Sequence, residues 1–171
     1  MVCIHNAKVV QETGILWDGV ILLDGDRIAA VGERREVQIP AECEMIDAQG
    51  AYVGPGFVDI HVHGGNGHMF DAEPLQAAEH FLKNGETTIL ATLYYNLSKE
   101  GFLDSIKKVQ AAMAAGGAGN AIAGIYMEGP YMNPKFGAMP ERNKWKGAIA
   151  EEAYKEVVDL AGTDVFVWSV A

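Results

Sequence analysis

Cysteine is scarce in this sequence, and long apolar runs are absent. The two cysteines, Cys3 and Cys43, fit neither a disulfide framework nor a metal-ligand spacing. No apolar stretch approaches the roughly 18 residues that a membrane-spanning helix needs. The first residues also lack a basic segment followed by an apolar one, which is the pattern of a secretion signal. We therefore expect a reduced, cytoplasmic protein with no membrane partner.

Positively charged residues are also few. The 171 residues include 13 Lys and Arg against 23 Asp and Glu, a formal net charge of −10 at pH 7. This excess of negative charge argues against nucleic acid or an anionic membrane as a partner. Hydrophobic residues make up 49% of the chain and charged residues 21%, which is ordinary for a soluble globular protein with a sizeable core.

Residues 1–53 have the pattern of a small all-β unit. Segments 4–10 and 19–23 have the pattern of strands, and 27–32 follows a turn as the partner of a hairpin. Strands this short carry little apolar bulk. They predict a thin sheet that would gain from a further layer packed on it.

Residues 54–171 alternate between strands and helices, which indicates an α/β fold. We expect buried strands at 57–62, 87–93, 121–127 and 164–171, with a helix in each of the three intervals. Such alternation is typical of a parallel sheet covered by helices. Four strands could form an open sheet or half of a (β/α)8 barrel, which usually takes about 250 residues. Because the chain ends on an apolar strand with no helix after it, we favour the half-barrel.

Two histidines mark the end of the first of these strands. Side chains alternate along a strand, so His61 and His63 point to the same side, where Gly64 and Gly65 leave room. Two imidazoles on one face can converge on a metal ion. The alternative is a pair of histidines in a solvated turn.

A carboxylate stands at the matching end of the third strand. Glu128 precedes Gly129 and Pro130, which halt the strand, and parallel α/β proteins place their chemistry at this edge. Because side chains alternate along a strand, Tyr126 lies on the same face as Glu128, and Asp59 lies on the same face as His61, one layer deeper. Asp59 could be a partner of a ligating imidazole or a structural polar residue. Two neutral histidines and a carboxylate are suitable ligands for a divalent metal that catalyses hydrolysis. Such a metal lowers the pKa of a bound water molecule and polarises the carbonyl under attack.

The loop after Glu128 contains an unusual group of basic residues. Between residues 134 and 147 the only acidic residue is Glu141, and the basic residues are Lys135, Arg142, Lys144 and Lys146. We call these four residues the basic island. They could form an ordinary solvated loop or attract an anionic substrate.

Two segments carry a resemblance to a known family. Residues 55–64, Pro-Gly-Phe-Val-Asp-Ile-His-Val-His-Gly, resemble the first barrel strand of the amidohydrolase superfamily. Residues 126–138, Tyr-Met-Glu-Gly-Pro-Tyr-Met-Asn-Pro-Lys-Phe-Gly-Ala, resemble the Glu-Gly-Pro…Gly-Ala motif of the N-acetylglucosamine-6-phosphate deacetylase family. Many amidohydrolases share the His-x-His pattern, whereas the Glu-Gly-Pro loop is specific. The resemblance covers the whole chain but only about the first half of a family member.

The resemblance implies a fold and an activity. It implies that 54–171 form the first four strands of a TIM (β/α)8 barrel and 1–53 the N-terminal part of a small β-sandwich. It also implies deacetylation of N-acetylglucosamine 6-phosphate, a small amino-sugar phosphate, by a homo-oligomeric enzyme. The family's catalytic aspartate, the general acid/base, would lie beyond residue 171, so we expect activity only in the full-length protein.

The resemblance also implies roles for individual residues. Glu128 matches a metal ligand, and His61 and His63 match ligands of a second metal in members that have histidines there. Ala138 and Met139 match substrate-binding positions, although the family often has histidine where Met139 stands. The expected cofactor is a divalent metal, zinc first, with iron, manganese or cobalt also accepted by such ligands. The basic island would then attract the phosphate of the substrate.

Two other interpretations stay open. The first is another amidohydrolase such as a cyclic amidase, although the Glu128 loop argues against it. The second is a non-catalytic fragment or assembly module. Half a barrel exposes two sheet edges and much apolar surface, so we expect it to aggregate or dimerise by itself.

Overall fold

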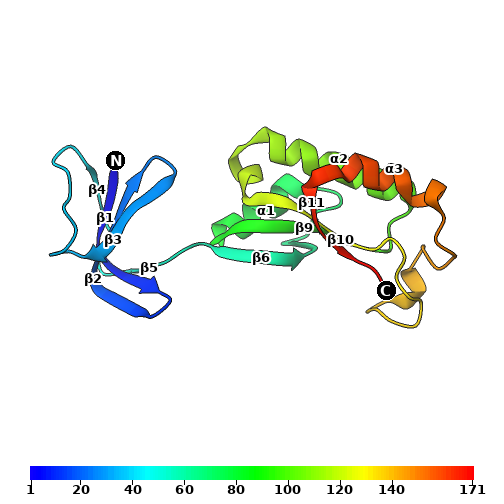
Figure 1. The fold of residues 1–171 in the computed structure, drawn as a ribbon, viewed down its shortest axis with the longest axis horizontal. Coiled ribbons are helices and arrows are strands. Elements are labelled where there is room, and N and C mark those ends of the chain that lie inside the picture. Colours follow the sequence, from blue (N-terminus) through cyan, green and yellow to red (C-terminus); the bar gives the residue numbers. More distant parts are fainter. The chain divides into compact units, whose positions relative to one another are not determined.

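The computed structural model describes residues 1–171 as two compact units, Met1–Pro55 and Gly56–Ala171 (Figure 1). The first unit is a five-stranded sheet with strand order β3-β2-β1-β4, in which β5 also pairs with β1. Its strands are β1 (Val2–Gln11), β2 (Gly14–Asp24), β3 (Arg27–Glu33), β4 (Glu44–Asp47) and β5 (Tyr52–Val53). The pairs β1–β2 and β2–β3 are antiparallel, so the predicted hairpin is confirmed.

The core of the first unit is small. One cluster of buried residues consists of Cys3, Val20 and Leu22, and a second consists of Ala7, Val9 and Ile21. Both cysteines are free, and burial raises the pKa of the Cys3 thiol. A mostly apolar hollow of about 360 Å³ remains open in this unit, with Ile4, Leu23, Ile28 and Val31 among its lining residues. The predicted thin sheet is confirmed.

The second unit contains a four-stranded parallel sheet with strand order β11-β10-β9-β6. Its strands are β6 (Phe57–Val62), β9 (Glu86–Leu93), β10 (Ile122–Glu128) and β11 (Val165–Ser169). A two-stranded antiparallel ribbon, β7 (Gly64–Gly65) and β8 (His68–Met69), follows β6. The four parallel strands that the sequence pattern predicted are all present.

Three helices lie along one face of this sheet (Figure 1). They are α1 (Pro74–Lys83), α2 (Lys99–Ala115) and α3 (Glu151–Ala161). Short 3-10 turns lie at Gly117–Ala121, Pro140–Arg142 and Gly162–Asp164. Ser98 caps α2, since its hydroxyl accepts a hydrogen bond from the Gly101 N–H at 3.2 Å. None of these helices is both long and apolar enough to cross a lipid bilayer.

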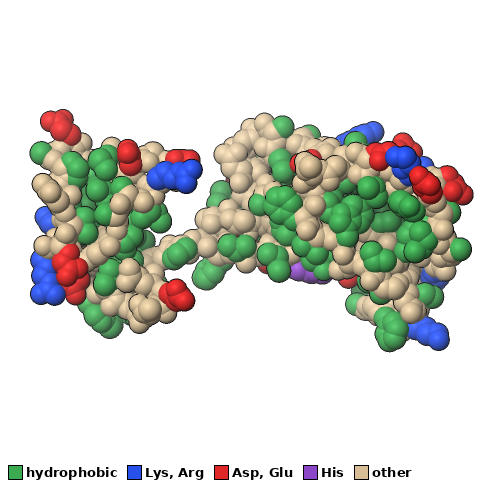
Figure 2. All heavy atoms as spheres, in the orientation of Figure 1, with side chains coloured by type: hydrophobic (Ala, Val, Ile, Leu, Met, Phe, Trp, Pro, Cys, Tyr) green, Lys and Arg blue, Asp and Glu red, His purple; other side chains and the backbone are tan.

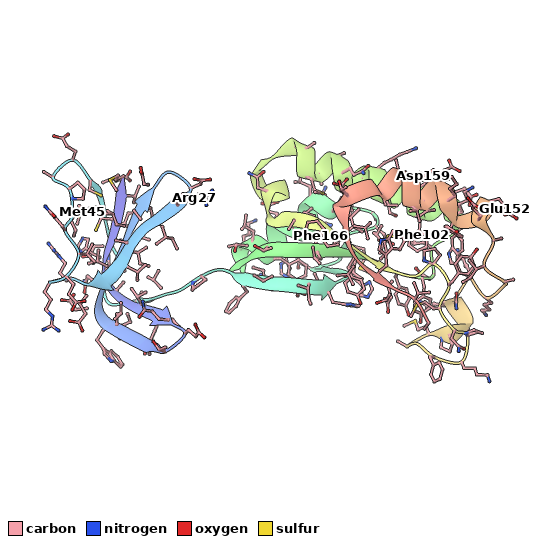
Figure 3. The ribbon with its side chains drawn as sticks, in the orientation of Figure 1. Arg27, Met45, Phe102, Glu152, Asp159 and Phe166 are labelled. Carbon is pink, nitrogen blue, oxygen red and sulfur yellow. The ribbon has the colours of Figure 1, made fainter.

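The main core lies between the helices and the sheet. Phe102 and Ile106 of α2 are fully buried with Ile89 of β9, in the same cluster as Val157 of α3. Figure 3 shows Phe102 inside this layer and the exposed residues Glu152 and Asp159 on α3. The amphipathic pattern that predicted these helices therefore also identifies the face that packs against the sheet.

The prediction that all four strands are buried is wrong for the two outer ones. Phe57, Val58 and Ile60 of β6 are 69%, 65% and 59% exposed, and Phe166 of β11 is 62% exposed. Each of these strands has a neighbour on one side only. Figure 2 shows hydrophobic side chains gathered over the part of this unit that β10 and β11 occupy in Figure 1. An edge strand keeps its apolar composition but lacks the second neighbour that would cover it.

Replacing Phe102 by alanine should lower the free energy of unfolding of the second unit by about 3–5 kcal/mol, because it leaves a cavity in the main core. Urea denaturation, with hydrogen exchange of the β9 amides as the local readout, measures the loss. The control is Phe136→Ala, which removes a ring that is 66% exposed and should change stability by less than about 0.5 kcal/mol. Equal losses in the two variants would contradict this description of the core.

Candidate metal centre

The parallel register of the second unit brings two strand ends together. Val62 of β6 pairs with Ala91 of β9, and Met127 of β10 pairs with Leu93 of the same strand. His61 and His63 lie at the end of β6, and Glu128 is the last residue of β10. The carboxyl ends of parallel strands share one edge of a sheet, which is where these three side chains meet.

The three side chains are close enough to bind one ion. Their ligand atoms all lie within 4.8 Å of one another, and the His63 Nε2 atom is 3.4 Å from Oε2 of Glu128. The imidazole rings of His61 and His63 have centroids 5.3 Å apart. Two ligands of a tetrahedral zinc ion lie about 3.4 Å apart, given bonds of roughly 2.1 Å. The spacing therefore fits a shared divalent metal.

The Glu128 carboxylate provides a further test of that fit. Its Oε2 atom is buried and has no hydrogen-bond partner. An unpaired buried carboxylate oxygen is costly, since it loses hydration without a replacement. Glu128 also lies next to two imidazoles whose nitrogens can bind a cation. The donor set, two nitrogens and one carboxylate oxygen, is of the kind that holds zinc and related metals in hydrolases.

His63 is held in the form that a ligand requires. Burial lowers the pKa of its imidazole, and the positive charge of a protonated His61 would lower it further. The negative charge of Glu128 and a hydrogen bond with the Thr92 backbone act in the opposite direction, and the net direction is downward. His63 is therefore neutral at pH 7, and neutral imidazole is the form that binds a metal.

Aromatic rings surround the two histidines. Tyr126 packs edge-on against His61 with ring centroids 4.5 Å apart, and Tyr94 packs in the same way against His63 at 5.1 Å. The hydroxyls of Tyr126 and Ser169 are hydrogen-bonded. Burial and the hydrogen bond to Tyr95 raise the pKa of Tyr94, so its hydroxyl keeps its proton. The rings fix the orientation of the imidazoles.

Asp59 forms no hydrogen bond with an imidazole. Its carboxylate accepts a hydrogen bond from the backbone N–H of His61 at 2.9 Å. Of the two roles that the sequence left open, the structure shows the structural one, because Asp59 holds the backbone from which His61 projects.

The loop 129–150 is folded by several buried contacts. Asn143 is buried, and its side-chain amide donates to the carbonyl of Met132 at 2.6 Å. The indole N–H of the buried Trp145 donates to the Leu97 carbonyl at 2.8 Å. Ala138 and Met139 are exposed near the middle of the loop, where the Met139 N–H donates to the Tyr95 hydroxyl at 3.0 Å. The loop is thus ordered over the strand ends.

Sequence reasoning did not identify Tyr94 and Tyr95 as residues of this site. Both directly follow β9, at the edge where His63 and Glu128 lie. Their position after a strand of the parallel sheet is the signal that could have identified them. It was missed because neither residue belongs to a motif.

No protein-family model matches the chain. The N-acetylglucosamine-6-phosphate deacetylase of Bacillus subtilis (strain 168) is 27% identical over 179 residues, covering 93% of this chain and 41% of the relative. The crystal structure of N-acetyl-D-glucosamine-6-phosphate deacetylase from Mycobacterium smegmatis matches with a TM-score of 0.77 and 28% identity, covering 100% of this chain and 47% of that one. The corresponding enzyme structure from Pasteurella multocida has a TM-score of 0.78 and 25% identity, with coverages of 99% and 44%.

The chain spans less than half the length of each of these relatives. The likeness extends over both compact units, since almost every residue of this chain is aligned. The family resemblance that the two sequence motifs indicated is confirmed: over its whole length, this mixed α/β chain is similar to part of the N-acetylglucosamine-6-phosphate deacetylases of the amidohydrolase superfamily.

Proposed function

We propose that this chain is the N-terminal portion of a metal-dependent hydrolase that converts N-acetylglucosamine 6-phosphate to glucosamine 6-phosphate and acetate. The observation that carries the proposal is the convergence of His61, His63 and Glu128 around a buried carboxylate oxygen with no partner. The likeness to deacetylases supports this choice of substrate over those of other amidohydrolases.

The fold belongs to the same proposal. Residues 54–171 would form the first four strands of a TIM (β/α)8 barrel, and residues 1–53 part of a β-sandwich. The uncovered outer strands β6 and β11 support a barrel that further strands complete, because parallel sheets normally have buried strands. We also propose a cytoplasmic homo-oligomer, as the family resemblance implies.

His61, His63 and Glu128 would hold a divalent metal, zinc first among zinc, iron, manganese and cobalt. When bound, such a metal would polarise the acetamide carbonyl and lower the pKa of a water molecule. The chain's own contribution is to supply two imidazoles, oriented by Tyr94 and Tyr126, beside a carboxylate. The general acid/base would be an aspartate outside these residues, so the 171-residue chain alone would be inactive.

The other end of the substrate would meet the loop 129–150. Ala138 and Met139 would contact the sugar, and the basic island would attract the phosphate. None of the four side chains in the basic island forms an ion pair, whereas Lys83, Lys99, Lys108 and Lys155 each pair with an acidic side chain. Unpaired cations in a protein of net charge −10 are available to an anionic ligand.

A second candidate function is that of a non-catalytic assembly module. The exposed apolar side chains of β6 and β11 favour it, since unpaired sheet edges readily bind another strand. Activity measurements separate the two functions.

Metal binding should depend on the three converging side chains. Replacing His63 by asparagine or Glu128 by glutamine should weaken zinc binding by more than about 100-fold. Even the loss of a residue that only supports a metal ligand typically lowers metal affinity about 10–100-fold. Equilibrium dialysis of the variants against zinc gives the affinities. The control is His5→Asn in the first unit, which should bind zinc like the unmodified chain. Equal affinity in all variants would contradict the site.

Acetate release from N-acetylglucosamine 6-phosphate tests the reaction. The full-length protein with zinc should release acetate, and Glu128→Gln should lower its kcat/KM more than about 100-fold because a metal ligand is lost. The 171-residue chain should show no turnover. Ring opening of a cyclic amide in place of acetate release would identify a cyclic amidase, and no hydrolysis of either substrate would favour the assembly module.

The basic island should accelerate capture of the phosphorylated substrate. Neutralising all four residues to glutamine in the full-length protein should lower kcat/KM about tenfold at low salt and flatten its salt dependence, because steering acts between charges over distance. The matched control neutralises Lys83, Lys107, Lys108 and Lys155, which changes the net charge equally. If both variants have the same salt-dependent kcat/KM as the unmodified protein, the island is only a solvated loop.

A further inference from the structure

Tyr95 lies between the metal centre and the loop 129–150. It is 1% exposed, and it stands two positions after the end of β9. Its hydroxyl accepts a hydrogen bond from the N–H of Met139 at 3.0 Å and another from the Tyr94 hydroxyl at 2.5 Å. A buried tyrosine hydroxyl normally finds polar partners, and here both come from the surroundings of the proposed site.

Two glycines allow the loop to pack closely on Tyr95. A Cβ atom on Gly129, whose φ is +90°, would lie 3.1 Å from the Cβ of Tyr95. A Cβ atom on Gly137, whose φ is +102°, would lie 2.7 Å from the Tyr95 hydroxyl oxygen. Both positions therefore favour glycine for its conformation and for its lack of a side chain. The segment from Gly129 to Met139 thus touches Tyr95 near both of its ends.

Tyr94 extends these contacts to the metal centre. Its ring packs edge-on against His63, with centroids 5.1 Å apart and planes at 86°. The rings of Tyr94 and Tyr95 are themselves 4.0 Å apart. A continuous series of contacts therefore runs from the His63 imidazole through both tyrosines to the Met139 amide.

The rest of the loop is held by other residues. The Tyr131 hydroxyl accepts a hydrogen bond from the Ala150 N–H at 3.2 Å, and Trp145 packs edge-on against the Tyr131 ring. These contacts fix the far end of the loop. Around Met139, the hydroxyl of Tyr95 is the side-chain group to which the loop backbone is hydrogen-bonded.

We propose that Tyr95 is a positioning residue that fixes the backbone at Ala138 and Met139 relative to the metal centre. It thereby sets where the loop meets the sugar of the substrate. The role rests on the proposed deacetylase function, and Tyr95 would act on the substrate indirectly, through the loop backbone. Its hydroxyl acts through the Met139 amide, and its ring supports the close approach of Gly129 and Gly137.

Hydrogen exchange tests the contact without any activity. In the full-length protein, Tyr95→Phe should speed exchange of the Met139 amide about fivefold or more, because one hydrogen bond is lost while the ring remains. The matched control is Tyr131→Phe, which removes the other tyrosine hydroxyl that accepts a backbone N–H of this loop. It should leave Met139 exchange unchanged, and zinc affinity should be the same in both variants.

Kinetics of the full-length protein test the consequence for the substrate. Tyr95→Phe should raise KM for N-acetylglucosamine 6-phosphate several-fold and leave kcat nearly unchanged. Unchanged Met139 exchange in Tyr95→Phe, or equal acceleration in both variants, would overturn the proposal. So would faster exchange with an unchanged KM in an active deacetylase. If the unmodified protein releases no acetate, the proposed function fails, while the exchange result still decides the contact.

Discussion

The parallel pairing of β6, β9 and β10 is the constraint on which the candidate site depends. The site residues on these strands lie at the end of β6 and the end of β10, with β9 between the two strands. In antiparallel pairing, β9 would run opposite to both of its neighbours, and Tyr94 and Tyr95 at its end would lie at the far edge of the sheet, away from His63 and Glu128. Parallel strands need long crossover connections, and α1 and α2 supply them. The helices therefore serve the site although none of them carries a ligand.

The polar groups of the candidate site are arranged in a way that favours binding of a ligand rather than the stability of the fold. The Glu128 carboxylate has a buried oxygen without a partner, and His63 stays neutral beside it because burial outweighs the attraction between the two groups. Such an arrangement is unfavourable by itself, since a buried charge is best compensated by an opposite one. A divalent cation would supply that charge. The cost of the unpaired carboxylate is thus a physical reason to regard the three side chains as a binding site.

The two outer strands show how far burial depends on neighbours. β9 and β10 each pair on both sides, and Ile89, Ala91, Ile125 and Met127 are fully buried there. β6 and β11 have similar apolar composition but expose much of it. Large exposed apolar surfaces usually mark interaction sites. The same reasoning applies to the first unit, where a thin sheet leaves an apolar hollow open.

The sequence alone determined the order and type of the main elements, because hydrophobic periodicity and turn residues act over a few positions. It also determined that His61 and His63 share a face and that Glu128 ends a strand, since strand parity is local. Tertiary structure alone decided that Phe57 and Ile60 are exposed and that Tyr95 joins Met139 to the metal centre. Each of these depends on contacts between residues far apart in the chain or on the number of neighbouring strands, and local periodicity carries no information about either.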